Sequence, residues 1–243
     1  MAAGDGAEAR RCVLETHDRP RADLSPGALP MIRRTAFALA LALAACPLWA
    51  ATYTLEPNHS MGTIRWSHLD FANPTAQFTR VEGTLEFDPA NPRMASVMVT
   101  IPLANLSSGI PDLDENLRSP AFFDLARFPT ATFKSTKVET TAMANRLKVT
   151  GNLTVHGITK PVTLDVTINK VGENARLKLP AVGFEAMATL KRSDFGLGKF
   201  VPQVSDEVTL HITTQADEAK GYAAYLKADA EEEAAEAAKA KKK

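Results

Sequence analysis

The chain has 243 residues, and its 28 Lys and Arg residues balance its 28 Asp and Glu residues, which gives a formal net charge of zero at pH 7. A neutral chain lacks the excess positive charge with which proteins bind polyanions, so we expect no nucleic-acid partner. The length is enough for one sizeable domain even after an N-terminal targeting segment is removed.

Residues 31–50 have the pattern of a secretory signal peptide. Arg33 and Arg34 precede the apolar run TAFALALALAAC, Pro47 ends that run, and Ala50 supplies a small residue for cleavage. The run is too short and too poorly flanked for a membrane-spanning helix. The sequence therefore predicts export through a cleaved signal.

Residues 1–30 precede this signal and are rich in Arg, Asp and Pro without any periodicity. A signal peptide has to stand at the start of a chain, so we hypothesise that Met31 is the true first residue and that 1–30 is a non-native or disordered extension. N-terminal sequencing of the precursor that found Met1 intact would contradict this hypothesis.

Both cysteines, Cys12 and Cys46, lie in the part that the signal would remove, so the mature chain can form no disulfide. Residues 43–46, Leu-Ala-Ala-Cys, also resemble a bacterial lipoprotein box in which Cys46 is lipidated. Pro47 is an awkward neighbour for that reaction and Ala50 offers an ordinary cleavage site. We expect a periplasmic protein, with a lipoprotein anchored at Cys46 as the alternative.

The mature chain begins in an extended pattern at residues 53–55 and continues through stretches in which apolar and polar residues alternate, the signal of half-buried β-strands. Turn residues separate them, for example Pro89 to Pro92. The eight predicted strands are 59–70, 79–88, 94–103, 130–140, 145–155, 158–170, 180–193 and 207–214.

The clearest pair is the hairpin 145–170. Leu147 and Val149 begin an apolar face on one arm, Val162 and Leu164 begin another on the second arm, and His156-Gly157 stands between the arms. A glycine at a tight connection between two alternating arms is typical of a β-hairpin. A lone hairpin cannot bury such a face, so other strands have to close over it.

Residues 104–129 lack a two-residue period and are punctuated by three prolines. Within them, 112–118 predicts a short helix, with Asp112 near its N-cap and Leu113 and Leu117 four residues apart. A long connection inside a compact β domain is often a lid, and Phe122-Phe123 would anchor it. The alternative is that these two rings only plug one end of the domain.

Together these elements predict an all-β domain over 51–216, an eight-stranded antiparallel barrel with a long, partly helical lid between the third and fourth strands. Few apolar positions face outward, so we prefer the barrel to the alternative, a two-sheet sandwich. A barrel of eight strands can hold one small ligand or only its own side chains. Residues 217–243 are rich in Ala, Glu and Lys and predict a solvated helix or a disordered tail.

Catalytic motifs are missing: the sequence has no G-x-S-x-G, no H-E-x-x-H and no phosphate-binding loop. We therefore predict no catalytic residue, no metal site and no enzyme. His68 could contact a ligand head group, and Arg192 is expected to pair with Asp194 to fix a corner. An apolar interior with few polar groups suits binding more than bond-breaking.

The ordered motifs resemble those of the YceI family over about residues 53–216. They are Asn58-His59-Ser60, Trp66-Ser67-His68-Leu69, Gly83 to Pro89 (GTLEFDP), Leu117 to Asp124 (LRSPAFFD), Phe128-Pro129, Phe133 to Thr136 (FKST), Gly151 to Val162 (GNLTVHGITKPV) and Arg192 to Gly196 (RSDFG). The resemblance implies a lipocalin-like barrel in the periplasm that holds a polyisoprenoid or similar long-chain amphiphile. The chain departs from the family pattern at Asn116, where the family often has His, and at Ile64-Arg65, where Phe is usual.

On this basis we expect a long-chain lipid, quinone-like or isoprenoid, as ligand and no other cofactor. A homodimer and transient contact with a membrane are left open. The alternatives are a ligand-free scaffold of the cell envelope and an enzyme that acts on a bound lipid through His68, Arg192 and Asp194. The predicted ligand-binding residues are Trp66, His68, Phe87, Val99, Ile101, Leu117, Phe122, Phe123, Phe133, Leu153, Phe184 and Phe195.

Overall fold

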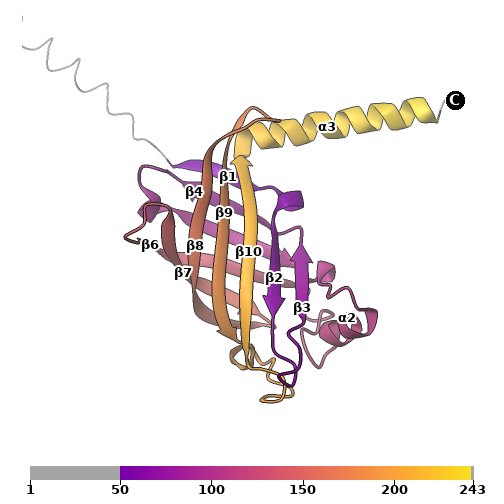
Figure 1. Ribbon diagram of the computed structural model, residues 1–243. Coiled ribbons are helices and arrows are strands. Elements are labelled where there is room, and N and C mark those ends of the chain that lie inside the picture. The colour runs from indigo at the N-terminus through magenta and orange to yellow at the C-terminus, as the bar shows by residue number, and fades with distance from the viewer. Residues whose placement is uncertain (1–49, 242–243) are drawn as a thin grey trace, which may run out of the picture. The chain divides into compact units, whose positions relative to one another are not determined.

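The computed structural model describes residues 50–241, and within them ten strands form one antiparallel sheet (Figure 1). The predicted extension 1–30 and, except for Ala50, the predicted signal 31–50 lie outside the described residues and stay predictions. The strands are β1 (Ala51–Leu55), β2 (Met61–Arg65), β3 (Thr75–Thr79), β4 (Glu82–Phe87), β5 (Ser96–Pro102), β6 (Thr130–Thr140), β7 (Arg146–Val155), β8 (Ile158–Asn174), β9 (Leu179–Lys191) and β10 (Glu207–Glu218).

The sheet closes into a barrel because β1 pairs with both β4 and β10. The order β1-β4-β5-β6-β7-β8-β9-β10 then returns to β1. Eight strands therefore form the ring, which confirms the predicted barrel and excludes the sandwich. The hairpin β2–β3 continues the wall, since β10 pairs with β2 from Thr209 to Thr213 and with β1 only from Ala216 onward.

Two interruptions explain why ten strands make an eight-stranded ring. The short 3-10 helix η2 (Pro57–His59) separates β1 from β2, and Arg80, whose φ is +59°, separates β3 from β4. Each pair is one bent wall strand, so the eight predicted strands match the ring in number. The predicted first strand is shorter than expected: β2 ends at Arg65 rather than at residue 70, because the chain turns there toward β3.

The predicted hairpin is confirmed as β7 and β8, joined by His156 and Gly157. Both turn residues have positive φ, 51° and 74°, as a tight type I′ connection requires. Gly151 in β7 is needed for a second reason, since a Cβ there would lie 2.4 Å from the Phe133 Cζ atom and 2.6 Å from the Lys134 carbonyl oxygen. The hairpin therefore packs directly against the ring of Phe133.

Antiparallel order places alternate connections at opposite ends of the barrel. The β2–β3, β5–β6, β7–β8 and β9–β10 connections lie at one end, which we call the lid end, at the bottom of Figure 1. The predicted long, partly helical connection is confirmed there between β5 and β6, and we call it the lid. It carries α2 (Pro111–Arg118), whose N-cap is Ile110 with Asp112 in its first turn. The other connections and α3 (Ala219–Ala240) lie at the α3 end.

The C-terminal helix is anchored to the barrel, which differs from the predicted solvated tail. Strand β10 runs on through Asp217 and Glu218, and Asp217 is fully buried while it accepts hydrogen bonds from Asn174 (2.8 Å) and Gln215 (2.9 Å). Tyr222 in the first turn of α3 is also buried, and its hydroxyl donates to Glu56 at 3.4 Å. From Leu226 to Lys241 the helix side chains are exposed, as its composition predicts.

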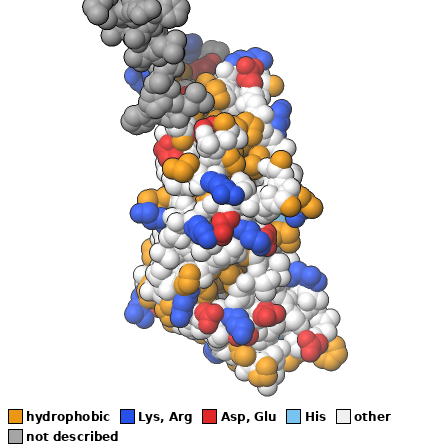
Figure 2. Space-filling model, turned by 90° about the vertical axis from the view of Figure 1, so that its left-hand side faces the viewer, with side chains coloured by type: hydrophobic (Ala, Val, Ile, Leu, Met, Phe, Trp, Pro, Cys, Tyr) orange, Lys and Arg blue, Asp and Glu red, His pale blue; other side chains and the backbone are white. Residues whose placement is uncertain are grey.

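The face of the barrel in Figure 2 carries basic and acidic side chains interspersed. One cross-strand pair is Lys148 and Asp165, whose Nζ and Oδ1 atoms lie 2.7 Å apart and exposed. Among residues 50–241 the structure contains no helix with the length and apolar character to span a membrane.

Candidate functional site

The barrel encloses two adjoining cavities, which we call the inner and the outer chamber. The inner chamber has a volume of about 140 Å³ and lies toward the α3 end, and the outer chamber has a volume of about 460 Å³ and lies toward the lid end. Phe78, Ile101, Leu153 and Leu210 line both chambers. The two chambers therefore adjoin at these side chains, and together we call them the lumen.

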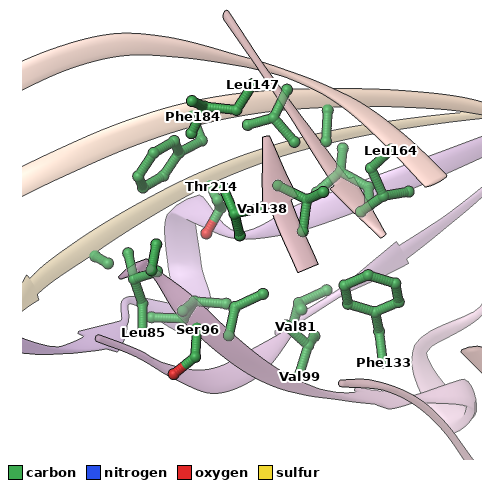
Figure 3. Close-up of a pocket in the computed structure, with 18 of the residues that line it drawn as sticks. Val81, Leu85, Ser96, Val99, Phe133, Val138, Leu147, Leu164, Phe184 and Thr214 are labelled. Atoms are coloured by element: carbon green, nitrogen blue, oxygen red, sulfur yellow. The ribbon is translucent and has the colours of Figure 1, made fainter. Parts of the chain in front are cut away.

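The inner chamber is almost wholly apolar (Figure 3). Ser96 and Thr214 supply its only polar side chains, and the Thr214 hydroxyl already shares a 2.6 Å hydrogen bond with that of Ser60. Phe87 and Phe184 pack edge to face with their ring centres 5.6 Å apart. A dry apolar cavity of about 150 Å³ admits a benzene-sized molecule, so this chamber has room for about one such group.

The outer chamber collects its polar groups near the surface. His68, Asn116, Arg192 and Lys199 are the polar residues that line it, and no acidic side chain is among its lining. His68, Asn116 and Lys199 are exposed, whereas the aliphatic and aromatic residues deeper in the chamber are largely buried. Apart from the hydroxyls of Ser96 and Thr214 in the inner chamber, a guest would therefore meet polar side chains only toward the lid end of the lumen.

All twelve residues predicted to bind a ligand line this lumen, although ligand binding by them stays a prediction. Trp66, His68, Leu117, Phe122, Phe123 and Phe195 line the outer chamber, Phe87, Val99, Phe133 and Phe184 line the inner chamber, and Ile101 and Leu153 line both.

Sequence reasoning missed lining residues where the alternation changes phase. Phe78 lines both chambers, but the predicted strand began only at residue 79. In β6 the alternation through Ala131 and Phe133 would continue to residue 137, yet a β-bulge between Ser135 and Lys137 shifts the register, so that Val138 lines the inner chamber instead. Phe78 could have been found from its spacing of two residues from Ala76, since both are apolar and both are buried.

The two rings predicted to anchor the lid both lie in the outer chamber. Phe123 packs against the hydrophobic core, and Phe122 lies against Phe200, with 6.2 Å between the ring centres. Lys199 stands over both Phe122 and Phe200, with its Nζ atom 6.0 and 4.9 Å from the ring centres. The lid and the β9–β10 connection therefore meet at the mouth of the lumen.

Polar bonds hold the start of the lid in place. The Asp114 carboxylate accepts hydrogen bonds from the Ser107 hydroxyl at 2.7 Å and from the backbone N–H and hydroxyl of Ser108 at 2.5 and 2.6 Å. The bonds from Ser108, followed by that from Ser107, lower the pKa of Asp114 to about 2. The tether is therefore charged throughout the neutral range.

The predicted Arg192–Asp194 pair is wrong. The buried Arg192 guanidinium donates to the carbonyl oxygens of Ser205 (2.7 Å), Lys199 (2.8 Å), Val204 (2.9 Å) and Leu197. Burial lowers the pKa of Arg192, and the carboxylate that opposes this shift is Asp206 rather than Asp194. Four carbonyls presented by one loop satisfy the guanidinium better than a single exposed carboxylate. Arg192 thus fixes the β9–β10 connection.

The remaining titratable side chains form no metal site in the part of the chain that the structure describes. Within the described range, no group of three or more His, Cys, Asp or Glu side chains is arranged to hold a metal ion. His59 lies beside Glu56, and the His156 ring packs against Phe128 with 4.7 Å between ring centres. Burial alone would raise the pKa of Glu56, but hydrogen bonds from Asn58 and His59 outweigh it, so that the pKa is lowered.

Comparison with known proteins places this geometry in a family. The sequence pattern of the YceI-like domain matches residues 53–216. A UPF0312 protein of Pseudomonas aeruginosa strain LESB58 is 35% identical over 190 residues, which cover 76% of this chain and 98% of that protein.

Solved structures show the same fold. BcnA of Burkholderia cenocepacia superposes with a TM-score of 0.58 at 26% identity, over 64% of this chain and 95% of that one. A domain from Saccharophagus degradans, described as polyisoprenoid-binding and implicated in plant cell wall breakdown, gives a TM-score of 0.55 at 14% identity, over 70% and 99% of the two chains. The described barrel and the matched residues together show that this chain belongs to the YceI-like family.

Proposed function

We propose that the protein binds one molecule of a polyisoprenoid or similar long-chain amphiphile in its lumen and carries it through the periplasm without changing it chemically. The observation that carries the proposal is the pair of adjoining, largely apolar chambers inside the barrel. The charged, imidazole and amide side chains of the lining all belong to the outer chamber, which matches a ligand with a long apolar tail and a small head.

The energetics of such a ligand explain why it needs a carrier. Each CH₂ group left in water costs about 0.8 kcal/mol, so a chain of several isoprene units is strongly disfavoured in an aqueous compartment. Transfer into a cavity lined by Phe, Val, Leu and Ile side chains offsets that cost. No bond has to be made or broken for this role.

The position of the polar groups also orients the guest. The tail would enter the inner chamber, where Ser96 and Thr214 are the only polar residues, and the head would stay beside His68, Asn116 and Lys199 at the mouth. With the lid end as the single polar end, loading and release would occur there, past Phe122 and Phe123.

Two further observations support the proposal. The Saccharophagus degradans domain, whose description names polyisoprenoid binding, has the same fold. Residues 31–50 have the pattern of a secretory signal, which would deliver the barrel to the periplasm.

Mass spectrometry of an organic extract of the purified protein tests the proposal. We expect one isoprenoid or other long-chain lipid per chain. The matched control is the same protein after delipidation and incubation with the extracted lipid, which should restore the same ratio. An extract without lipid, together with no uptake by the delipidated protein, would favour the ligand-free scaffold instead.

A further inference from the structure

Exposed apolar side chains gather at the lid end of the barrel. Phe71 is 93% exposed, and it and Phe200 are the two phenylalanines more than a third exposed among the described residues. Figure 2 shows hydrophobic side chains at the lower tip of the face it presents, below the band of mixed charges. We call the following set the apolar rim: Leu69 and Phe71 in the β2–β3 connection, Ile110 in the lid, Ile158 at the β7–β8 turn, and Phe200 and Val201 in the β9–β10 connection.

Hydrogen bonds hold the connections that carry the apolar rim in a fixed conformation. The Leu69 N–H donates to the Gln203 carbonyl oxygen at 2.8 Å, and His68 pairs with Val204 in an isolated bridge, so the β2–β3 and β9–β10 connections hold each other. Arg192 clamps the second of them from inside. Leu69 and Phe200 have φ values of 54° and 65°, an unfavourable conformation for bulky residues. The fold therefore maintains these apolar groups in water.

The rim is continuous with the mouth of the lumen. Phe200 belongs to the rim and also lines the outer chamber, and the β2–β3 connection that bears Phe71 also supplies Trp66 and His68 to that chamber. Contact between Phe122 and Phe200 joins the lid to the same edge. A guest that leaves the outer chamber would thus cross apolar side chains before it reached water.

We propose that the apolar rim docks onto the surface of a lipid bilayer, so that the outer chamber opens directly onto the membrane. The proposal rests on the proposed function, because a carrier of a membrane lipid has to collect and deliver it there. Loops with exposed Phe, Leu and Ile insert into the headgroup region in proportion to the apolar area they bury. Lys199 beside Phe200 adds a cation that anionic headgroups attract.

A vesicle-flotation assay with matched variants tests this inference. The rim variant is Leu69→Asn, Phe71→Ser and Ile110→Ser, three exposed residues that do not line either chamber. Asn tolerates the positive φ at position 69, and Ser suits the N-cap position of α2. The wall variant is Met98→Ser, Met143→Ser and Met187→Ser, which removes three side chains 52–60% exposed elsewhere on the barrel. All proteins share residues 1–50, so any contribution from that segment cancels.

With vesicles of phosphatidylethanolamine and phosphatidylglycerol, we expect the wild type and the wall variant to float alike. The partition coefficient of the rim variant onto the vesicles should be at least about tenfold lower than that of the wild type, because the variant has less apolar area to bury in the bilayer. Equal flotation of rim variant and wild type, equal loss in the wall variant, or no flotation of the wild type would each overturn the proposal. So would a wild-type dimer that the rim variant converts to a monomer, since a second copy would then cover the rim.

Lipid analysis of the same proteins separates the two proposals. If the rim variant keeps its bound lipid but no longer floats, docking and binding are distinct and both proposals stand. If the wild type keeps its lipid but does not float, only the docking proposal fails. If no protein takes up lipid while the wild type floats through its rim, the proposed function fails and docking stands.

Discussion

Filling the inner chamber should shorten the ligand that the barrel accepts. Ala186 in β9 is buried, lines the inner chamber and pairs with Val166 and Ile212, which line it too. A Phe at this position adds a ring about as large as the guest that a chamber of about 140 Å³ admits. We therefore expect Ala186→Phe to occupy the space intended for the end of the ligand tail.

The magnitude follows from the carbons displaced. One isoprene unit has five carbons, and about 0.8 kcal/mol for each gives an upper value of about 4 kcal/mol, or between two and three orders of magnitude in affinity. Stability should change little, because burial of the new ring contributes up to about 3 kcal/mol while overpacking costs about 1–3 kcal/mol. The effect is thus expected on binding rather than on folding.

Titration with geraniol, farnesol and geranylgeraniol, each one isoprene unit longer than the last, measures this effect. Tryptophan fluorescence reports binding, since Trp66 lines the outer chamber. In the wild type the affinity should rise with each added unit until the lumen is full, and in Ala186→Phe it should stop rising one unit earlier. Met187→Phe is the matched control, because that side chain points outward and is 52% exposed. An identical chain-length profile in Ala186→Phe and the wild type would refute a tail in the inner chamber.

Three further predictions concern the lid end. Phe123→Asp puts a charge where Phe123 packs against the core, so the amount of co-purified lipid should fall while the barrel still folds. Mass spectrometry measures the lipid, with Ala121→Asp as the exposed control, and an unchanged amount in Phe123→Asp would count against a lid. Because bonds from Ser108 and Ser107 lower the folded pKa of Asp114 to about 2, its tether should persist at every pH above the unfolded value near 3.8 and be lost as the pH falls through 2. Amide exchange at Ser108 checks this, and loosening already at pH 5 would contradict it. Arg192→Met leaves four loop carbonyls without their donor, so the free energy of unfolding measured in urea should fall by about 2–4 kcal/mol. A decrease below about 0.5 kcal/mol, as for a neutral surface change, would show that water replaces the guanidinium.

Much of the barrel could be predicted from the sequence because period-two alternation reports which face of a strand is buried. The hairpin from Arg146 to Thr167 is the clearest case, since its two arms pair residue by residue up to the turn at His156-Gly157. Alternation fails where the backbone inserts an extra residue. The bulge after Ser135 is one example, since it brings Val138 rather than residue 137 to the inner face.

The remaining differences come from contacts that the alternation of apolar and polar residues does not report. Arg192 was expected to pair with its near neighbour Asp194, but the fold brings the carbonyls of residues 197–205 around it. Tyr222 lies in a stretch rich in Ala, Glu and Lys that predicts exposure, yet Glu56, 166 residues away, accepts its hydrogen bond. Burial, followed by the charge of Glu56, raises the pKa of this tyrosine to about 12. Neither environment has a signal in the local sequence.

The central claim, that a long apolar guest lies along the lumen with its tail toward the α3 end, is tested most directly by photo-crosslinking. A geranylgeranyl probe with a diazirine at the tail end would be bound to the delipidated protein, irradiated, and its attachment sites mapped by mass spectrometry. The account predicts adducts on inner-chamber residues such as Phe87, Val138 and Phe184, in β4, β6 and β9. Adducts confined to the outer face of the barrel or to the exposed part of α3 would contradict it.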